Sequence, residues 1–272
     1  MDDQKIELET HLPEPIEPEN LEPKIRKGSS FKWFLMISLL CSLGVGAFFY
    51  FHQPHHYSFP LRTVEDTTLA TVKIFDFKEP IQQFWKEHVF NDRSSYQVEN
   101  DTLHAASNGN SSMIYQEVKL GPVDRPFLTW DWKAVRFPAN KTGKSLADKS
   151  NNDFTGRVYA IFKGRSPIAA DVIQYVWDDH FPKGTSSGSP FLNSVRILVI
   201  ESGTAPDWVS EKRDLLQDYQ TLFGRRPRWP LSAVGIMTDS DNTKTQSEIY
   251  YRNFALKKPQ PAAEPSKEPE NI

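Results

Sequence analysis

A polar run near the carboxyl end of the chain, Thr238-Asp239-Ser240-Asp241-Asn242-Thr243, has the residue types and spacing best suited to chemistry. Oxygen-bearing side chains alternate directly after an apolar segment, so Asp239 and Asp241 could converge on a hard cation such as Ca²⁺. The run lacks the sixth-position glycine and closing glutamate of an EF-hand loop. The favoured interpretation is a tight turn in which Asp and Asn bond their own backbone, and metal binding is the second.

A serine-containing pattern, Gly184-Thr185-Ser186-Ser187-Gly188, matches the G-x-S-x-G nucleophile elbow of hydrolases. An elbow needs a strand leading into it and a helix following it. No strand is expected directly before Gly184, and Pro190 and another strand follow, so the pattern predicts a flexible Gly/Ser loop.

Two groups of residues could supply metal ligands: Asp178-Asp179-His180 and the histidines at 52, 55 and 56. Neither group has its remaining ligands at a diagnostic spacing. The first is interpreted as a solvated turn and the second as a connector beside a membrane.

Aromatic side chains recur on the expected strands together with Asp, Asn and Arg. An aromatic face beside polar groups suits sugar recognition, because a pyranose presents an apolar C–H face and a ring of hydroxyls. The core of a β-sandwich uses the same residue types, so most are assigned to the core and one or two to a ligand. The set comprises Trp130, Trp132, Tyr159, Tyr175, Trp177 and Tyr251.

Composition narrows the classes of function. The chain has 272 residues and a formal net charge of −3, which lacks the basic excess expected of a nucleic-acid binder. Its one cysteine, Cys41, lies inside an apolar segment, so the chain has no intramolecular disulfide and no cysteine nucleophile in its polar part.

An uncharged segment, 33–51, is the expected transmembrane helix. Nineteen residues at helical rise span about 28 Å, close to the hydrocarbon thickness of a bilayer. Trp33 and Tyr50 suit the two interfaces. A cleaved signal peptide is the alternative, but the segment exceeds a usual signal core and Ala47-Phe48-Phe49 is not a small-x-small cleavage site.

The flanking segments orient this helix. Residues 1–32 carry eight acidic side chains and four prolines, a composition typical of a disordered tail, and basic residues gather at its end. The positive-inside rule places this tail in the cytoplasm and the remaining chain in the periplasm, with 52–69 as a connector. Residues 257–272 are predicted to be a second disordered tail.

Between the tails, short segments of alternating polarity indicate β-strands. In 127–134, for example, Leu128, Trp130 and Trp132 share one face. No βαβ rhythm or internal repeat occurs, so the fold class expected for 70–256 is a mainly β, jelly-roll-like antiparallel sandwich. The expected strands are 72–77, 112–120, 127–134, 157–163, 172–177, 195–200, 233–238 and 248–256.

One clear α-helix is expected at 207–223, where apolar residues recur at helical spacing. Asp207 suits the amino-terminal cap, and Gly224 suits the left-handed position that closes a helix.

An ordered series of motifs resembles the bacterial domain-of-unknown-function family 3047 over about residues 74–256. The series consists of Trp130-Asp131-Trp132-Lys133, Asn152-Asp153-Phe154, Arg157-Val158-Tyr159, Tyr175-Val176-Trp177, Ser202-Gly203, Arg213, Asp218-Tyr219, Phe223-Gly224, Met237 to Thr243 and Tyr250-Tyr251. The resemblance implies a bacterial envelope setting and a layout similar to galactose-binding-like domains, and it implies no reaction. The family usually has two acidic residues where this chain has Asn152-Asp153.

The sequence is compatible with three functions. The first is a non-catalytic module that binds a glycan or another envelope component; the second is a polysaccharide-acting enzyme that pairs Asp153 with Asp239 or Asp241. The third is a scaffold subunit of a membrane complex. In a structural alternative to ligand binding, Arg157 and Arg213 form buried ion pairs with Asp218 or Asp153 that hold the helix to the sheet. The candidate ligand-binding residues are Asp153, Arg157, Tyr159, Trp177, Arg213, Asp218, Asp239, Asp241 and Asn242.

Overall fold

The computed structural model describes residues 57–58, 68–121, 124–165 and 169–260. The expected transmembrane segment, 33–51, and the expected amino-terminal tail, 1–32, lie outside these residues. Of the expected carboxyl-terminal tail, 257–272, the structure describes only residues 257–260. Within the described ranges, no helix is both long and apolar enough to cross a membrane.

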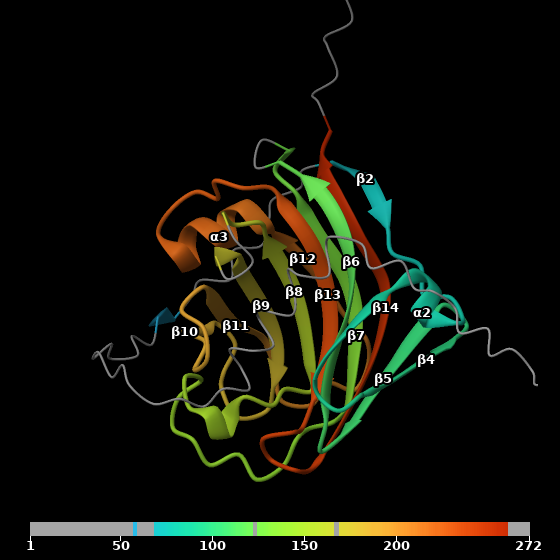
Figure 1. Cartoon of the computed structure of the whole chain (residues 1–272), viewed down its shortest axis with the longest axis vertical. Helices are drawn as coiled ribbons and strands as arrows, with labels where there is room; N and C mark the ends of the chain where they lie inside the picture. The colour runs from blue at the N-terminus through green and yellow to red at the C-terminus, as the bar shows by residue number, and fades with distance from the viewer. Residues whose placement is uncertain (1–56, 59–67, 122–123, 166–168, 261–272) are drawn as a thin grey trace, which may run out of the picture.

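The described strands form two sheets (Figure 1). The larger sheet has eight strands, in the order β1 (Tyr57–Ser58), β10 (Thr185–Gly188), β11 (Val195–Ser202), β9 (Asp171–Asp178), β8 (Gly156–Phe162), β13 (Leu231–Asp239), β6 (Ser111–Leu120) and β3 (Lys86–Asn91). The smaller has the order β12 (Val209–Asp214), β7 (Phe127–Arg136), β14 (Gln246–Pro259), β5 (Thr102–Asn108) and β4 (Ser95–Glu99), with β2 (Leu69–Ile74) also paired to β14. The expected mainly β sandwich is thus confirmed.

Strand direction departs from the expectation in one place. β9 and β11 run parallel to each other, whereas the other paired strands are antiparallel. Two parallel strands need a crossover, and here the chain makes it through β10, which pairs with β11 on the far side. The larger sheet is therefore mixed, and the prediction of a wholly antiparallel sandwich is wrong for this pair.

The core lies between the sheets and is rich in aromatic rings. Trp130 and Trp132 of β7 face Tyr175 and Trp177 of β9, and the ring centroids of Trp132 and Trp177 lie 5.2 Å apart. Tyr251 of β14 completes this group, and its hydroxyl donates to the carbonyl of Met237. The assignment of most aromatic residues to the core is correct.

The helical segment is shorter than expected. Residues Val209–Asp214 form β12, an edge strand on β7, and helix α3 spans Leu215–Phe223. The cap is Asp214, whose side chain accepts from the backbone N–H groups of Leu216 and Gln217, and the prediction of Asp207 as cap is wrong. As a strand, the six residues of β12 pair with β7, and a longer helix would lose this pairing. Gly224 closes α3 with φ of 66°, as predicted.

Two short helical segments lie elsewhere in the described chain: α2, Ile81–Phe84, and a 3₁₀ turn, Lys149–Asn151.

Two local predictions also need correction. The expected flexible loop at 184–188 contains β10, since Ser186 and Ser187 pair with β11. Asp178 is fully buried rather than solvated: it pairs with the buried Lys141 ammonium and accepts from the N–H of Phe181. A buried carboxylate needs such partners.

Two acidic residues, one on each sheet, interact electrostatically. Glu211 of β12 lies near the charge of Glu201 of β11, and Lys183 lies 2.5 Å from the Glu201 Oε1 atom. The buried Oε1 atom of Glu211 has no hydrogen-bond partner among the described residues. Burial, and then the charge of Glu201, raise the pKa of Glu211 to about 8. Folded Glu211 therefore holds a proton at neutral pH, which removes its repulsion by the Glu201 charge.

This arrangement predicts a pH-dependent stability. Because the pKa of Glu211 is higher in the folded than in the unfolded chain, the stabilisation is complete below the unfolded pKa, decreases as pH rises toward about 8, and is lost above it. The free energy of unfolding should fall by roughly 2–4 kcal/mol over this range, discounted for partial exposure.

Urea denaturation at several pH values measures the effect, and Glu211→Gln should flatten the profile. Glu117→Gln, at a carboxylate whose side chain is 48% exposed, serves as the control. An unchanged slope in Glu211→Gln would show that this carboxyl group does not titrate as described.

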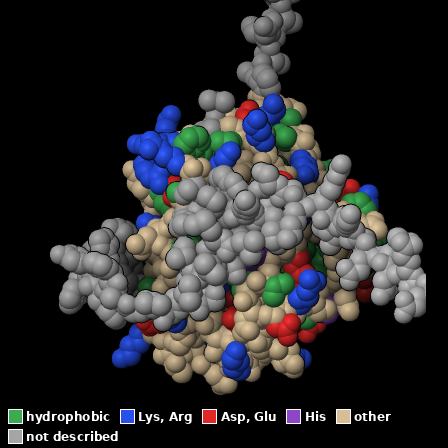
Figure 2. Space-filling view, viewed as in Figure 1, with side chains coloured by type: hydrophobic (Ala, Val, Ile, Leu, Met, Phe, Trp, Pro, Cys, Tyr) green, Lys and Arg blue, Asp and Glu red, His purple; other side chains and the backbone are tan. Residues whose placement is uncertain are grey.

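Figure 2 shows Lys and Arg side chains gathered at the upper left of the visible described surface and Asp and Glu side chains mainly in its lower half.

Candidate functional site

The turn between β13 and β14 meets the start of β8 at one end of the sandwich, shown at the bottom of Figure 1. There, the Arg157 guanidinium binds Asp239 with two hydrogen bonds, Nε to Oδ1 at 2.9 Å and Nη2 to Oδ2. Arg157 also donates to Gln174 and to the carbonyl of Asn152. Both charged side chains are almost fully buried, at 2% and 1% exposed, so each depends on the other.

Asp153 holds the tip of the same turn. Its Oδ1 atom accepts from the backbone and side-chain N–H groups of Asn242, at 3.1 and 2.9 Å, and its Oδ2 atom accepts from the Thr243 N–H at 2.6 Å. These bonds fix a turn that the sequence predicts from its Asp and Asn residues. The structure thus brings together five candidates: Asp153, Arg157, Asp239, Asp241 and Asn242.

The electrostatics of this cluster reflect burial and crowding. Burial raises the pKa of Asp239 to about 7, with Arg157 opposing the rise and Asp153 adding to it. Burial and the nearby Asp153 charge also raise the pKa of Asp241. Arg157 therefore partly neutralises three close carboxyl groups.

A cation has few free ligands in this arrangement. One oxygen from each of Asp153, Asp239 and Asp241 lies within 4.8 Å of the others, which is compatible with a shared ion. Both oxygens of Asp153 and both of Asp239 already accept N–H groups of the protein. Calcium would compete with these donors for the same oxygens while Arg157 repels it, so Arg157 takes the neutralising role a cation would have.

The same geometry does not suit glycosidic acid–base catalysis. Such enzymes place two carboxyl groups about 5–9.5 Å apart, facing a cleft. Asp153 and Asp239 are 0% and 1% exposed, lie within 4.8 Å of each other, and bond to the protein. A polysaccharide cannot reach either side chain in this arrangement.

The remaining candidates lie elsewhere. Arg213 binds Asp218 through two hydrogen bonds, of 2.9 and 2.6 Å, and Tyr175 donates to the same carboxylate. The Arg213–Asp218 pair holds α3 to β12 of the smaller sheet, and the Tyr175 hydrogen bond joins α3 to β9 of the larger sheet. Arg213 and Asp218 therefore have the structural role that is the alternative to ligand binding. Trp177 is buried in the core and donates to the carbonyl of Gly203. Tyr159 lies on the outer face of the larger sheet, where it is 5% exposed and its hydroxyl contacts the Met237 sulfur.

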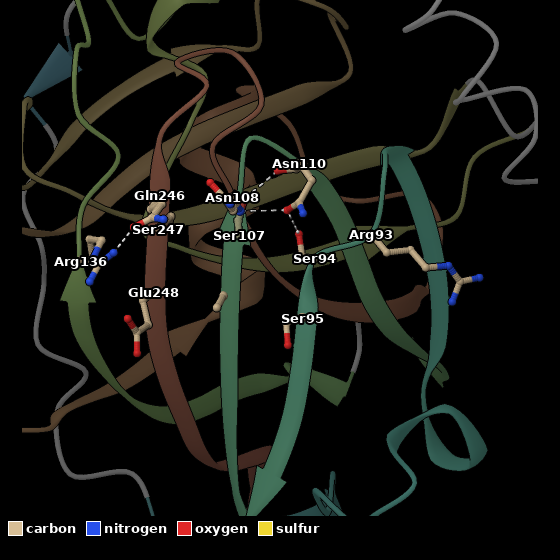
Figure 3. Close-up of a pocket in the computed structure, with 11 residues that line it drawn as sticks. Arg93, Ser94, Ser95, Ser107, Asn108, Asn110, Arg136, Gln246, Ser247 and Glu248 are labelled. Atoms are coloured by element: carbon tan, nitrogen blue, oxygen red, sulfur yellow. Dashed lines mark hydrogen bonds between the residues drawn. The ribbon is translucent and has the colours of Figure 1, made fainter.

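A polar hollow of about 360 Å³ lies beside the cluster, where β4, β5, β7 and β14 approach the same end of the sandwich. Figure 3 shows side chains from these strands surrounding it. Its lining includes Ser95, Asn108, Asn110, Arg136, Gln246 and Glu248. These are hydroxyl, amide, guanidinium and carboxylate groups, the types that bind a hydroxylated ligand.

Hydrogen bonds connect the hollow to the cluster. Ser240, in the turn after Asp239, accepts from the Gly109 N–H at 2.9 Å and bonds the hydroxyl of Ser107, which lines the hollow. The Ser240 N–H donates to the carbonyl of Asn110. The Arg157–Asp239 pair therefore positions, through the turn, one wall of the hollow.

Sequence reasoning missed the hollow because its residues are polar, lie apart in the chain, and match no catalytic motif. One local signal was present: Asn108-Gly109 favours a tight turn, and Gly109 adopts φ of 69°. Sequence alone does not bring that turn next to Arg136 and Gln246.

Comparison of the sequence with models of known protein families identifies the family of this chain. The model described as "Protein of unknown function (DUF3047)" matches residues 83–255, which is more than half of the chain. The chain belongs to this family, which confirms the resemblance seen in the motifs. No curated protein matches the sequence.

Solved structures offer distant likenesses. One is the xyloglucanase domain of NopAA, a type three effector from Sinorhizobium fredii, with 8% identity, TM-score 0.40, and coverage of 63% of this chain and 92% of that chain. Another is a structure described as "CBM4 structure and function", with 10% identity, TM-score 0.33, and coverage of 70% and 96%. A third is a family 30 carbohydrate-binding module from Clostridium thermocellum, with 12% identity, TM-score 0.31, and coverage of 63% and 85%. At these scores, no property is transferred from them.

The cluster predicts a large effect of Arg157→Gln, because the substitution leaves Asp239 buried without its cation. The free energy of unfolding should fall by about 3–5 kcal/mol. Arg225→Gln is the matched control, since Arg225 pairs with Asp171 at 2.6 Å but its side chain is 47% exposed; the cost there should be at most about 1 kcal/mol.

Thermal denaturation of the same proteins with Ca²⁺ or with a chelator tests whether the three carboxyl groups of the cluster bind this ion. The wild-type melting temperature should be the same in both conditions. A rise of several degrees with Ca²⁺ would mean that the carboxylates bind the ion despite Arg157.

Proposed function

We propose that this protein is a single-pass inner-membrane protein whose jelly-roll-like β-sandwich lies in the periplasm and binds a glycan or another component of the cell envelope. Its amino terminus is cytoplasmic, and the helix at 33–51 is the anchor. The sandwich acts as a binding module, with the polar hollow as its site.

The observation that carries the binding proposal is the chemistry of the hollow. A volume of about 360 Å³ is near the lower end of the range for small-molecule sites. Amide and hydroxyl groups can each exchange hydrogen bonds with sugar hydroxyls. The bonds from Ser240 to Ser107 and Gly109 hold one wall in place, which lowers the entropy lost on binding.

The membrane proposal has its support in the sequence. The uncharged segment 33–51 matches a bilayer in length, and Lys24, Arg26, Lys27 and Lys32 precede it. A binding module tethered in this way meets its ligand at the surface of the same membrane. An envelope polymer or glycolipid satisfies that geometry.

Binding can be measured with the full-length chain in detergent, applied to immobilised polysaccharides from bacterial envelopes. We expect retention on at least one of them. The double substitution Asn108→Ala and Gln246→Ala should reduce retention about tenfold or more, since it removes two amide groups from the hollow. Gln97→Ala, outside the hollow, should bind like the wild type. If no envelope polymer is retained, the binding function is wrong.

Topology can be measured independently with a reporter fused after Ile272. Alkaline phosphatase in that position should be active in intact cells, because the enzyme matures only outside the cytoplasm. Replacing the four basic residues before the helix by Glu should lower this activity by weakening the orientation signal. An active cytoplasmic reporter together with an inactive phosphatase would refute the periplasmic location.

A further inference from the structure

The hydrogen-bonding groups left over in the hollow are mainly donors. The Asn110 Oδ1 atom accepts from the Asn108 N–H at 3.3 Å and from the Ser94 hydroxyl at 3.2 Å. The Gln246 Oε1 atom accepts from the Arg136 guanidinium. Because a backbone N–H and a guanidinium can only donate, they fix how both amides are turned. The two amide NH₂ groups then have no acceptor among the described residues.

Arg136 is the cation of the hollow. Its guanidinium makes one bond, to Gln246, among the described residues, and an arginine has five N–H groups to donate. Arg93 also lines the hollow, but its guanidinium binds Glu87 at 2.7 Å and points away in Figure 3.

The pairing of β7 with β14 would normally give the Arg136 guanidinium a carboxylate partner. Arg136 of β7 lies directly opposite Glu248 of β14, a position that favours an ion pair. Instead, the Glu248 carboxylate lies 2.9 Å from the His104 Nε2 atom of β5. Glu248, the one carboxylate that lines the hollow, therefore pairs with His104 instead of Arg136. No carboxylate lies within ion-pair distance of Arg136 in the described chain.

We propose that the hollow binds an acidic sugar, with the carboxylate of a uronic acid residue against Arg136 and the amide NH₂ group of Gln246, and with the Asn110 amide facing another oxygen of the sugar. Arginine binds carboxylates through two parallel hydrogen bonds, and the neighbouring amide donors add to this recognition. The sugar hydroxyls contact Ser95, Asn108 and Glu248. This inference rests on the proposed glycan-binding function and narrows it to acidic glycans.

The test compares three polymers applied to the full-length chain in detergent: polygalacturonate with carboxylates, dextran sulfate with sulfates, and neutral dextran. We expect polygalacturonate to bind best and to weaken as salt rises, because a charge pair is screened. Arg136→Gln should weaken this binding at least about tenfold. Glu248→Gln should strengthen it, because the substitution removes a negative charge near the ligand.

Arg228→Gln is the matched control, since Arg228 is exposed and does not line the hollow. Equal melting temperatures of the two arginine variants would show that Arg136→Gln remains folded.

The outcomes separate the inference from the function on which it rests. Equal binding of dextran and polygalacturonate, unaffected by Arg136→Gln, would refute acidic-sugar recognition and leave glycan binding standing. Preference for dextran sulfate over polygalacturonate would refute a carboxylate as the group that Arg136 binds. If none of these polymers binds and envelope polysaccharides are not retained either, the proposed function fails together with the inference.

Discussion

The buried ion pair of Arg157 and Asp239 is the interaction on which the end of the sandwich depends. A guanidinium that is 2% exposed has lost its water, so its N–H groups must find acceptors within the protein. Asp239, Gln174 and the carbonyl of Asn152 supply them, and in doing so they join the start of β8 to the end of β13. The turn that follows is thereby placed where Asp153 can accept its N–H groups.

The consequences reach the other sheet. Because Ser240 follows Asp239 directly, a fixed β13 end also fixes the serine that bonds Ser107 and Gly109. The polar hollow between β4, β5, β7 and β14 therefore has a wall that is set before any ligand arrives. The buried acidic residues support the site, and the chemistry offered to a ligand comes from the exposed Arg136 and Gln246 and the partly buried Asn110.

Sequence patterns predict the buried parts of this fold better than the polar ones. Alternation around Trp130 and Trp132 identifies β7 because both residues must face the core, and the continuous apolar run 158–162 identifies β8, which is buried along its length. The strands β3, β4, β5, β10 and β12 carry weaker patterns, and β3, β4 and β12 lie at the edges of their sheets. The Asn100-Asp101 turn between β4 and β5 was a usable signal, with φ of 50° and 59°. The Asp153–Asn242 cluster was foreseeable as a set of residues, but the hollow depends on register between distant strands.

Hydrogen exchange of the full-length protein, with and without an acidic oligosaccharide, can show whether a turn fixed by Arg157 and Asp239 shapes the binding hollow. The amides of Asn242 and Thr243 should exchange slowly in the free protein, and the ligand should add protection around Asn108, Arg136 and Gln246. Fast exchange of the turn in the free protein, or ligand protection confined to the outer face of β8, β9 and β13, would contradict this prediction.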